Sequence, residues 1–186
     1  MKKLLTDRQF RDALTNLFKS IESALPKGVP LAVVGIRTRG EILARRVARR
    51  LSTVRGKAVD LGILDITFYR DDLSLRKGMP LVRATEINFD LDGKVVLLID
   101  DVLQTGRSVR AAMDALIDFG RPRAIRLAVL IDRGGRELPI CPDFLGAEVT
   151  APTDKRVQVK LKEIDGQEGV FLVEPARTRR TVKRKR

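Results

Sequence analysis

The sequence contains no histidine and no tryptophan, and Cys141 is its only cysteine among 186 residues. Without histidine, the base of Ser-His-Asp and Cys-His enzymes is excluded, and so are the usual zinc sites. A single cysteine excludes an internal disulfide framework and fits a reducing compartment, so we expect a cytoplasmic protein. Any catalysis must rest on carboxylates, basic groups, backbone amides or a hard metal ion.

Aromatic residues and long apolar segments are also scarce. Aromatic residues make up 4% of the chain, which argues against a stacking platform for single-stranded bases. No apolar run approaches the roughly 20 residues that cross a bilayer. Segment 1–8 places charges where a signal peptide needs an apolar region. We therefore expect neither membrane insertion nor secretion.

Positive charge is abundant, with 37 basic against 24 acidic residues and a net charge of +13. Segment 177–186, RTRRTVKRKR, contains no acidic residue. This balance indicates an anionic partner, either a phosphorylated small molecule or nucleic acid, although a run of like charges is also typical of a solvated, disordered tail. We expect one folded domain over 1–175 and a basic, disordered tail over 176–186.

Apolar periodicity predicts the secondary structure. A capping box at Thr6 and Gln9 opens a helix with one apolar stripe, which ends before Pro26. Further helices are predicted after Gly40 and from near Ser108. Buried strands are predicted over 31–36, 94–99 and 124–131, and another strand over 59–69. The segments 157–164 and 170–174 are predicted to form an antiparallel hairpin. Strands that alternate with helices predict an α/β, doubly wound fold with a parallel core, in which ligands bind beyond the carboxyl ends of the strands.

The strongest chemical signal follows the buried strand 94–99. Two adjacent carboxylates, Asp100 and Asp101, are followed by Thr105, Gly106 and Ser108 at a predicted helix start. Backbone N–H groups there form an anion site, and carboxylates beside it can bind sugar hydroxyls or magnesium. Either feature alone is more often a helix cap, but together they indicate a ribose-phosphate site.

A second pair of glycines has to be compared with the P-loop of nucleoside triphosphatases. Gly35 and Gly40 have the spacing of a P-loop, but Glu41 follows in place of lysine, which excludes a nucleoside triphosphatase of that type.

Several segments carry a family resemblance. Residues 95–109 resemble the phosphoribosyl-pyrophosphate (PRPP) motif of type I phosphoribosyltransferases. The segments VGIRTRG, DITFYRDDLS, AAMDALIDFGRPR and LAVLIDRGGRELPI, which begin at residues 34, 65, 111 and 127, are similar to the PyrR family. That family comprises bacterial regulators of pyrimidine operons with uracil phosphoribosyltransferase activity. The resemblance extends to Glu174 and does not cover the basic tail.

The resemblance implies an enzyme that forms UMP and pyrophosphate from uracil and PRPP, with Mg²⁺ held mainly through PRPP. It also implies a homo-oligomer and pyrimidine-leader mRNA as a partner. In this assignment Asp100 and Asp101 are catalytic and contact the ribose, and residues 70–83 form a flexible loop that closes over the site. The remaining substrate contacts are Thr38 and Arg39 at pyrophosphate, Thr105, Gly106, Arg107 and Ser108 at the 5-phosphate, and Arg133 and the backbone near Val157 at uracil. Val102, Leu103 and Gln104 are further substrate-binding residues. Because Arg39 lies in a polar turn, we expect its loss to leave stability almost unchanged.

Four positions depart from the pattern of RNA-binding relatives. Asn16, Gly135, Cys141 and Ala147 stand where basic residues or histidine are usual in the family. Phosphate contacts supply much of the affinity for RNA, so these changes weaken the regulatory interpretation. An RNA-binding attenuation regulator with little or no turnover remains the alternative, and a transferase acting on a purine base is a third.

Overall fold

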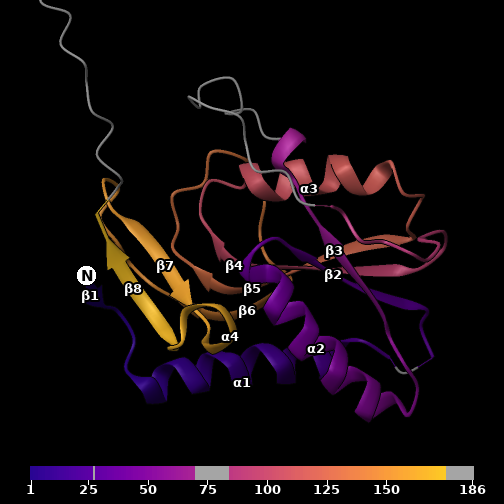
Figure 1. The fold of residues 1–186 in the computed structure, drawn as a ribbon, viewed down its shortest axis with the longest axis horizontal. Coiled ribbons are helices and arrows are strands. Elements are labelled where there is room, and N and C mark those ends of the chain that lie inside the picture. The colour runs from indigo at the N-terminus through magenta and orange to yellow at the C-terminus, as the bar shows by residue number, and fades with distance from the viewer. Residues whose placement is uncertain (27, 70–83, 175–186) are drawn as a thin grey trace, which may run out of the picture.

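The computed structural model describes residues 1–26, 28–69 and 84–174. A five-stranded, wholly parallel sheet in the order β3-β2-β4-β5-β6 forms its centre (Figure 1). The strands are β2 (Leu31–Ile36), β3 (Asp60–Leu64), β4 (Val95–Leu103), β5 (Ala124–Asp132) and β6 (Phe144–Glu148). This is the predicted α/β fold.

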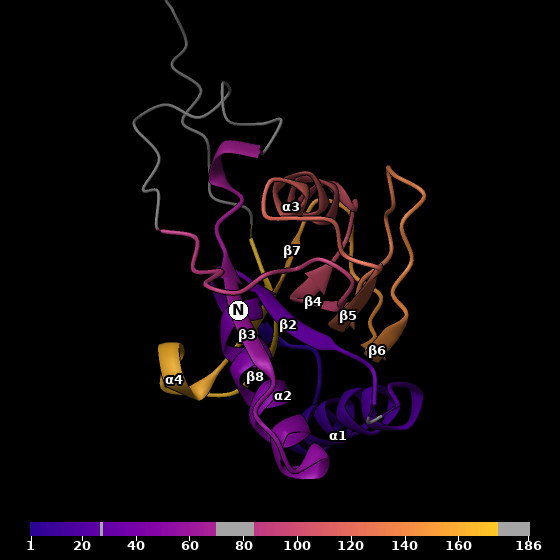
Figure 2. The same ribbon diagram turned by 90° about the vertical axis from the view of Figure 1, so that its right-hand side faces the viewer.

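Helices cover both faces of the sheet. These are α1 (Asp7–Ala24), α2 (Arg39–Arg55) and α3 (Arg107–Ile117). Figure 2 shows the sheet between α3 on one side and α1 with α2 on the other. A second, antiparallel sheet in the order β1-β8-β7 stands at one end. It contains β1 (Lys2–Lys3), β7 (Arg156–Lys160) and β8 (Gly169–Val173), with the short helix α4 (Lys162–Asp165) between the last two.

The first helix forms as predicted. The Gln9 N–H donates to the Thr6 hydroxyl at 3.3 Å, and the Thr6 N–H donates to the Gln9 side chain at 2.9 Å. This capping box satisfies N–H groups that would otherwise lack partners at the helix start. The apolar stripe then buries Phe10, Leu17 and Ile21 against the sheet.

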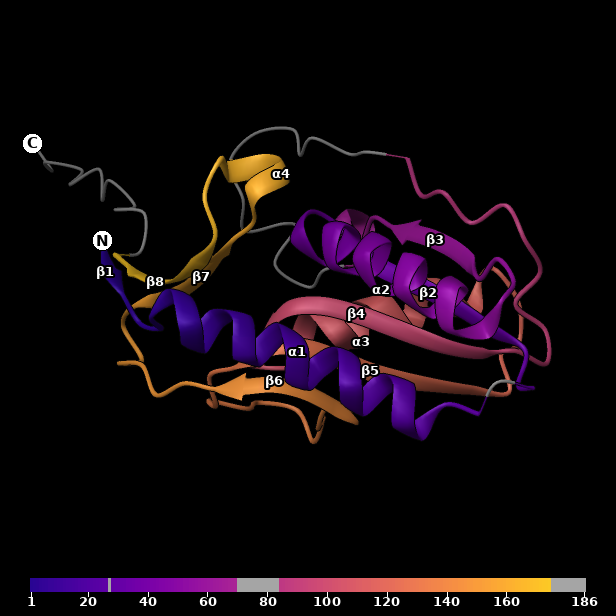
Figure 3. The same ribbon diagram turned by 90° about the horizontal axis from the view of Figure 1, so that it is seen from below.

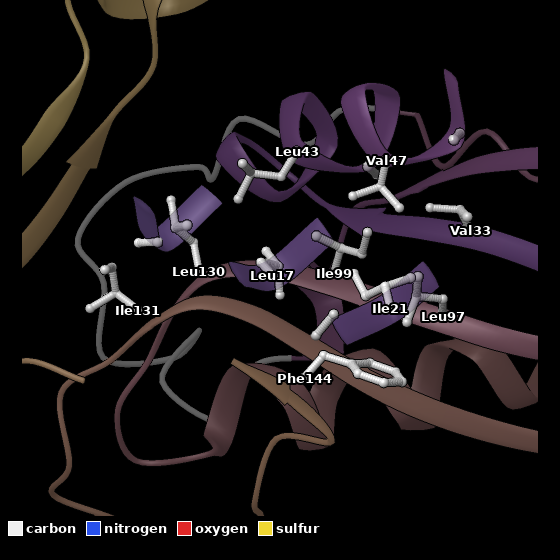
Figure 4. Packing of buried hydrophobic residues seen from close by; sticks show 14 of the residues in the cluster. Leu17, Ile21, Val33, Leu43, Val47, Leu97, Ile99, Leu130, Ile131 and Phe144 are labelled. Carbon is white, nitrogen blue, oxygen red and sulfur yellow. The ribbon is translucent and has the colours of Figure 1, made fainter. Parts of the chain in front are cut away.

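Strand β4 explains why the core has two layers. Its side chains alternate between faces, so Leu97 and Ile99 pack with α1 and α2 whereas Val96 and Leu98 pack with α3. Figure 4 shows the first layer, where Leu97 and Ile99 meet Ile21. A strand buried on both faces accounts for the uninterrupted apolar run in the sequence.

Several boundaries differ from the sequence predictions. The strand predicted over 59–69 ends at Leu64, because Asp65 accepts the Thr67 N–H at 2.8 Å and the chain turns into a short helix, η1 (Thr67–Tyr69). The hairpin is present, but β7 stops at Lys160 and Ile164 belongs to α4. Strand β6 was not predicted. The loop expected over 70–83 and the tail over 176–186 lie outside the described residues.

Strand β4 also runs further than expected. It continues to Leu103, which pairs with Asp132 of β5, and Asp100 pairs with Val129. The acidic pair therefore lies within the sheet rather than in the loop that follows it. Pairing of Asp100 and Val102 with β5 holds the backbone on both sides of Asp101, and α3 begins soon after the end of β4, at Arg107.

Candidate active site

A cleft of about 300 Å³ opens at the carboxyl end of β4. This is where ligands bind in open parallel sheets. Figure 1 shows the β7–β8 hairpin beside this end of the sheet. The lining residues are Asp100, Val102, Leu103, Gln104, Thr105, Gly106, Arg107, Ser108, Val109, Arg156 and Val157. The cleft thus unites most of the predicted ribose-phosphate residues with the start of the hairpin.

The turn from β4 into α3 has the geometry of an anion site. Gly106 adopts φ +89°, a left-handed conformation that favours glycine, and α3 starts at the next residue. The N-cap position is Gly106, which has no side chain to cap the helix. The preceding residue contributes one bond, in which Thr105 Oγ1 accepts the Arg107 N–H at 3.3 Å. The backbone N–H groups of the first turn and the partial positive charge of the helix end therefore favour a bound phosphate.

The segment after β5 holds this turn in place. Arg136 donates to the Gln104 carbonyl at 2.9 Å and to the Ile140 carbonyl at 2.7 Å, and it forms an ion pair with Asp132. The Glu137 N–H donates to the Thr105 carbonyl at 3.0 Å. These contacts join the turn from β4 into α3 to residues about thirty positions further along the chain, so local sequence patterns could not predict the individual partners.

The two carboxylates differ in environment. Asp100 is 8% exposed and lines the cleft, and its Oδ1 accepts the Asp101 N–H at 2.8 Å. Burial raises the pKa of Asp101, although the hydrogen bond with Asp100 and the positive charge of Arg39 act in the opposite direction. Asp101 therefore shares its electrostatic surroundings with the predicted pyrophosphate residue.

Gly40 allows the start of α2 to lie close to the backbone of β4. A Cβ on Gly40 would lie 2.5 Å from the Ile99 carbonyl oxygen and 3.2 Å from the Asp100 Cα. The first turn of α2 therefore touches the backbone of β4 beside the acidic pair. The peptide bond between Arg37 and Thr38, at the entrance to this turn, is cis.

Arg39 has a partner that the sequence did not reveal. Its Nε and Nη2 donate to Asp165 at 3.2 and 2.7 Å. The partner follows 126 residues later in the chain. This two-pronged ion pair joins α2 to α4, so Arg39 has a structural contact besides its predicted role at pyrophosphate, and the expectation that its loss leaves stability almost unchanged stays a prediction. Neither Thr38 nor Arg39 is among the residues that line the cleft itself.

Arg133 is not among the residues that line the cleft. The residue is 7% exposed, and its guanidinium donates to the Lys155 carbonyl at 2.7 Å and to the Pro152 carbonyl at 3.0 Å. These bonds hold the segment that leads directly to Arg156 and Val157. Val157 lines the cleft as predicted, whereas Arg156 was missed, although its position next to Val157 was the available signal.

Residues 1–26, 28–69 and 84–174 contain no group of three or more histidine, cysteine, aspartate or glutamate side chains placed to hold a metal ion. Across these same residues, every helix is too short or too polar to span a bilayer.

Comparison with known proteins agrees with this geometry. A sequence profile described as "Phosphoribosyl transferase domain" matches residues 1–158. A Roseiflexus protein named "Bifunctional protein PyrR" is 49% identical over 178 residues, which cover 95% of this chain and 97% of the relative. The Thermus aquaticus protein of the same name is 51% identical and covers 92% of this chain and 95% of its own.

Solved structures show the same fold. The hypoxanthine phosphoribosyltransferase of Trypanosoma cruzi aligns with a TM-score of 0.65 and 18% identity, covering 95% of this chain and 98% of its own. A Staphylococcus aureus hypoxanthine phosphoribosyltransferase gives a TM-score of 0.65 and 18% identity, with coverage of 94% and 91%. At such identities the likeness concerns the fold alone. Together with the relatives that are about half identical over nearly their whole length, these matches show that the chain belongs to the PyrR family within the phosphoribosyl transferase domain family.

Proposed function

We propose that this protein is a uracil phosphoribosyltransferase, which joins N1 of uracil to C1 of the ribose of PRPP as the bond from C1 to pyrophosphate breaks, and which releases pyrophosphate and the N1 proton. One observation carries the proposal. One cleft contains the buried carboxylate of Asp100 and the start of helix α3 at 105–108, in a chain about half identical to bifunctional PyrR proteins. A carboxylate beside an anion site is the arrangement that a ribose 5-phosphate requires.

The residues suit the charges that the reaction develops. As the bond from C1 to pyrophosphate breaks, the ribose becomes positive and the leaving group becomes more negative. Asp100 and Asp101 stabilise the positive sugar, Arg39 stabilises the leaving group, and the N–H groups at 105–108 hold the 5-phosphate. Uracil needs no strong base when departure of pyrophosphate leads, so the lack of histidine is no obstacle. The Val157 backbone, positioned through Arg133, meets the base.

The acidic pair also fits magnesium. Magnesium in proteins takes one or two carboxylates together with substrate phosphate oxygens rather than a complete cage of side chains. Asp100 and Asp101 provide carboxylates of this kind, and PRPP would provide the other oxygens. When bound, the ion supplies positive charge against the departing pyrophosphate.

The proposal is tested by separate incubations with magnesium, PRPP and one nucleobase at a time. We expect UMP from uracil and no nucleotide from hypoxanthine, guanine or adenine. Formation of a purine nucleotide in place of UMP would overturn the choice of base. Failure to form any nucleotide, while PRPP still binds, would favour a regulator without turnover.

A second activity, binding of pyrimidine-leader mRNA, is favoured by the net charge of +13 and by the bifunctional relatives. Three arginines of helix α2 offer reduced charge to RNA. Arg45, Arg46 and Arg50 each form an ion pair with a glutamate, which reduces the charge they offer to phosphate. Asn16, Gly135 and Cys141 are exposed and uncharged. We therefore assign most of the RNA affinity to the segment 177–186. Both roles place the protein in the cytoplasm.

Deletion of 177–186 tests this second activity. Binding to leader RNA and to a scrambled RNA is measured over a salt titration, with and without the segment. We expect the deletion to weaken binding and flatten the salt dependence while UMP formation persists, because counterion release scales with the phosphates contacted. Tight, sequence-selective binding by the truncated protein would instead assign RNA recognition to the folded domain.

A further inference from the structure

Asp165 joins the hairpin to the predicted pyrophosphate turn. It ends α4, between β7 and β8, and Figure 3 shows α4 beside one end of α2. Both of its carboxylate oxygens accept hydrogen bonds from Arg39, and Oδ2 also accepts the Leu161 N–H at 2.9 Å. The side chains of Asp165 and Arg39 are 13% and 23% exposed. The pair is thus largely withdrawn from solvent and anchored to backbone on the hairpin side.

This contact fixes the plane of the guanidinium. Two parallel N–H to oxygen bonds determine both the position and the orientation of an arginine fork. Among the described residues, Nη1 of Arg39 has no hydrogen-bond partner, so its donors remain for an anion. The charge of Arg39 also reaches Asp101. Arg39 is therefore held between a structural carboxylate and a predicted catalytic one.

We propose that Asp165 is a positioning residue for pyrophosphate: it holds Arg39 in the orientation in which the guanidinium meets the pyrophosphate group of PRPP. This inference rests on the proposed function, in which Arg39 binds pyrophosphate. Without Asp165, the long Arg39 side chain would have to be ordered at each binding event, which weakens binding. The hairpin that supplies Val157 to the base end of the cleft would thereby also serve the pyrophosphate end.

A purely mechanical role for Asp165 is the alternative, and the structure offers a matched control. Arg46 of α2 forms ion pairs with Glu163 at 2.7 Å and with Glu168 at 2.5 Å. Glu163 therefore links the same two helices, α2 and α4, without touching Arg39. If the ion pair between Arg39 and Asp165 only docked the hairpin, loss of the Glu163 ion pair should have similar effects.

The test compares steady-state kinetics of the wild type, Asp165→Asn, Glu163→Gln and Arg39→Ala. We expect Asp165→Asn to raise the KM for PRPP and the inhibition constant of pyrophosphate about tenfold, with the KM for uracil within about twofold of wild type. Glu163→Gln should leave all three unchanged. Adding Asp165→Asn to Arg39→Ala should cause no further loss, because both act through one group. If Asp165→Asn does not fold, Asp165→Glu, which keeps the charge but shifts it by one methylene, should show the same pattern at smaller size.

The outcomes separate the two proposals. Equal effects of Asp165→Asn and Glu163→Gln on the KM for PRPP would show that Asp165 only docks the hairpin on α2, and would overturn the inference. An unchanged KM for PRPP in Asp165→Asn, with a raised one in Arg39→Ala, would overturn it while the proposed function stands. An unchanged KM for PRPP in Arg39→Ala would instead remove Arg39 from the pyrophosphate site and refute that part of the proposed function.

Discussion

Gly40→Ala tests whether α2 touches β4 beside the acidic pair. The added methyl group would lie 2.5 Å from the Ile99 carbonyl oxygen and 3.2 Å from the Asp100 Cα. Both atoms belong to the backbone of the central strand, so no side-chain rotation relieves the clash. Overpacking of this kind costs about 1–3 kcal/mol, and an unyielding backbone places Gly40→Ala near the upper end, at about 3 kcal/mol. For a chain of this size that lowers Tm by roughly 6–12 °C.

The same substitution should impair the site. If α2 moves away from β4 to admit the methyl group, Arg39 moves away from Asp101, and the KM for PRPP rises. Calorimetry and UMP kinetics measure the two effects. Gly28→Ala is the matched control, because a Cβ there would meet nothing within 4 Å; its Tm should change by less than about 2 °C. A Tm and a KM for PRPP in Gly40→Ala that match the wild type would refute the close contact.

Three further outcomes are expected. Asp101→Asn, which removes charge but keeps size, should lower kcat for UMP formation about 100-fold at saturating substrates; an unchanged kcat would remove Asp101 from catalysis. Burial opposes ionisation of Asp165, but hydrogen bonds from Arg39 and the Leu161 N–H outweigh it and lower its pKa below the usual 3.8. This stabilisation is present above the unfolded pKa and lost as pH falls through the folded one, so the Tm difference between wild type and Asp165→Asn should hold from pH 7 to about 4 and shrink below that. Arg156→Ala, which removes a cation from the cleft lining, should raise the KM for uracil severalfold, whereas Lys155→Ala, which loses only a surface ion pair with Glu174, should not.

Local signals in the sequence predicted local structure well. The capping box at Thr6 and its apolar stripe located α1, and the uninterrupted apolar run before Asp100 located the central strand. The turn from β4 into α3 could be predicted because glycine and hydroxyl residues stand next to one another in the chain. In each case the residues that determine the structure lie within a few positions of one another in the chain. Over such short distances the period of the apolar residues and the residue types at turns predict the structure.

Contacts between distant segments could not be predicted in this way. Nothing in the turn around Arg39 indicates Asp165, and nothing near Arg133 indicates the carbonyls of Pro152 and Lys155. Strand β6 was not predicted, because Gly146 interrupts its apolar pattern. In the structure, a Cβ on Gly146 would lie 2.5 Å from the Leu130 carbonyl oxygen. That close approach is a property of the packed sheet, not of the segment alone.

The proposed function requires the cleft at the end of β4 to hold a ribose phosphate in one defined orientation. A crystal structure of the full chain with bound UMP would show this orientation. We predict the phosphate at the backbone N–H groups of 105–108, the ribose hydroxyls at Asp100 and Asp101, and the uracil ring beside Val157. A nucleotide bound elsewhere, or bound in the cleft with its phosphate away from the start of α3, would contradict the account.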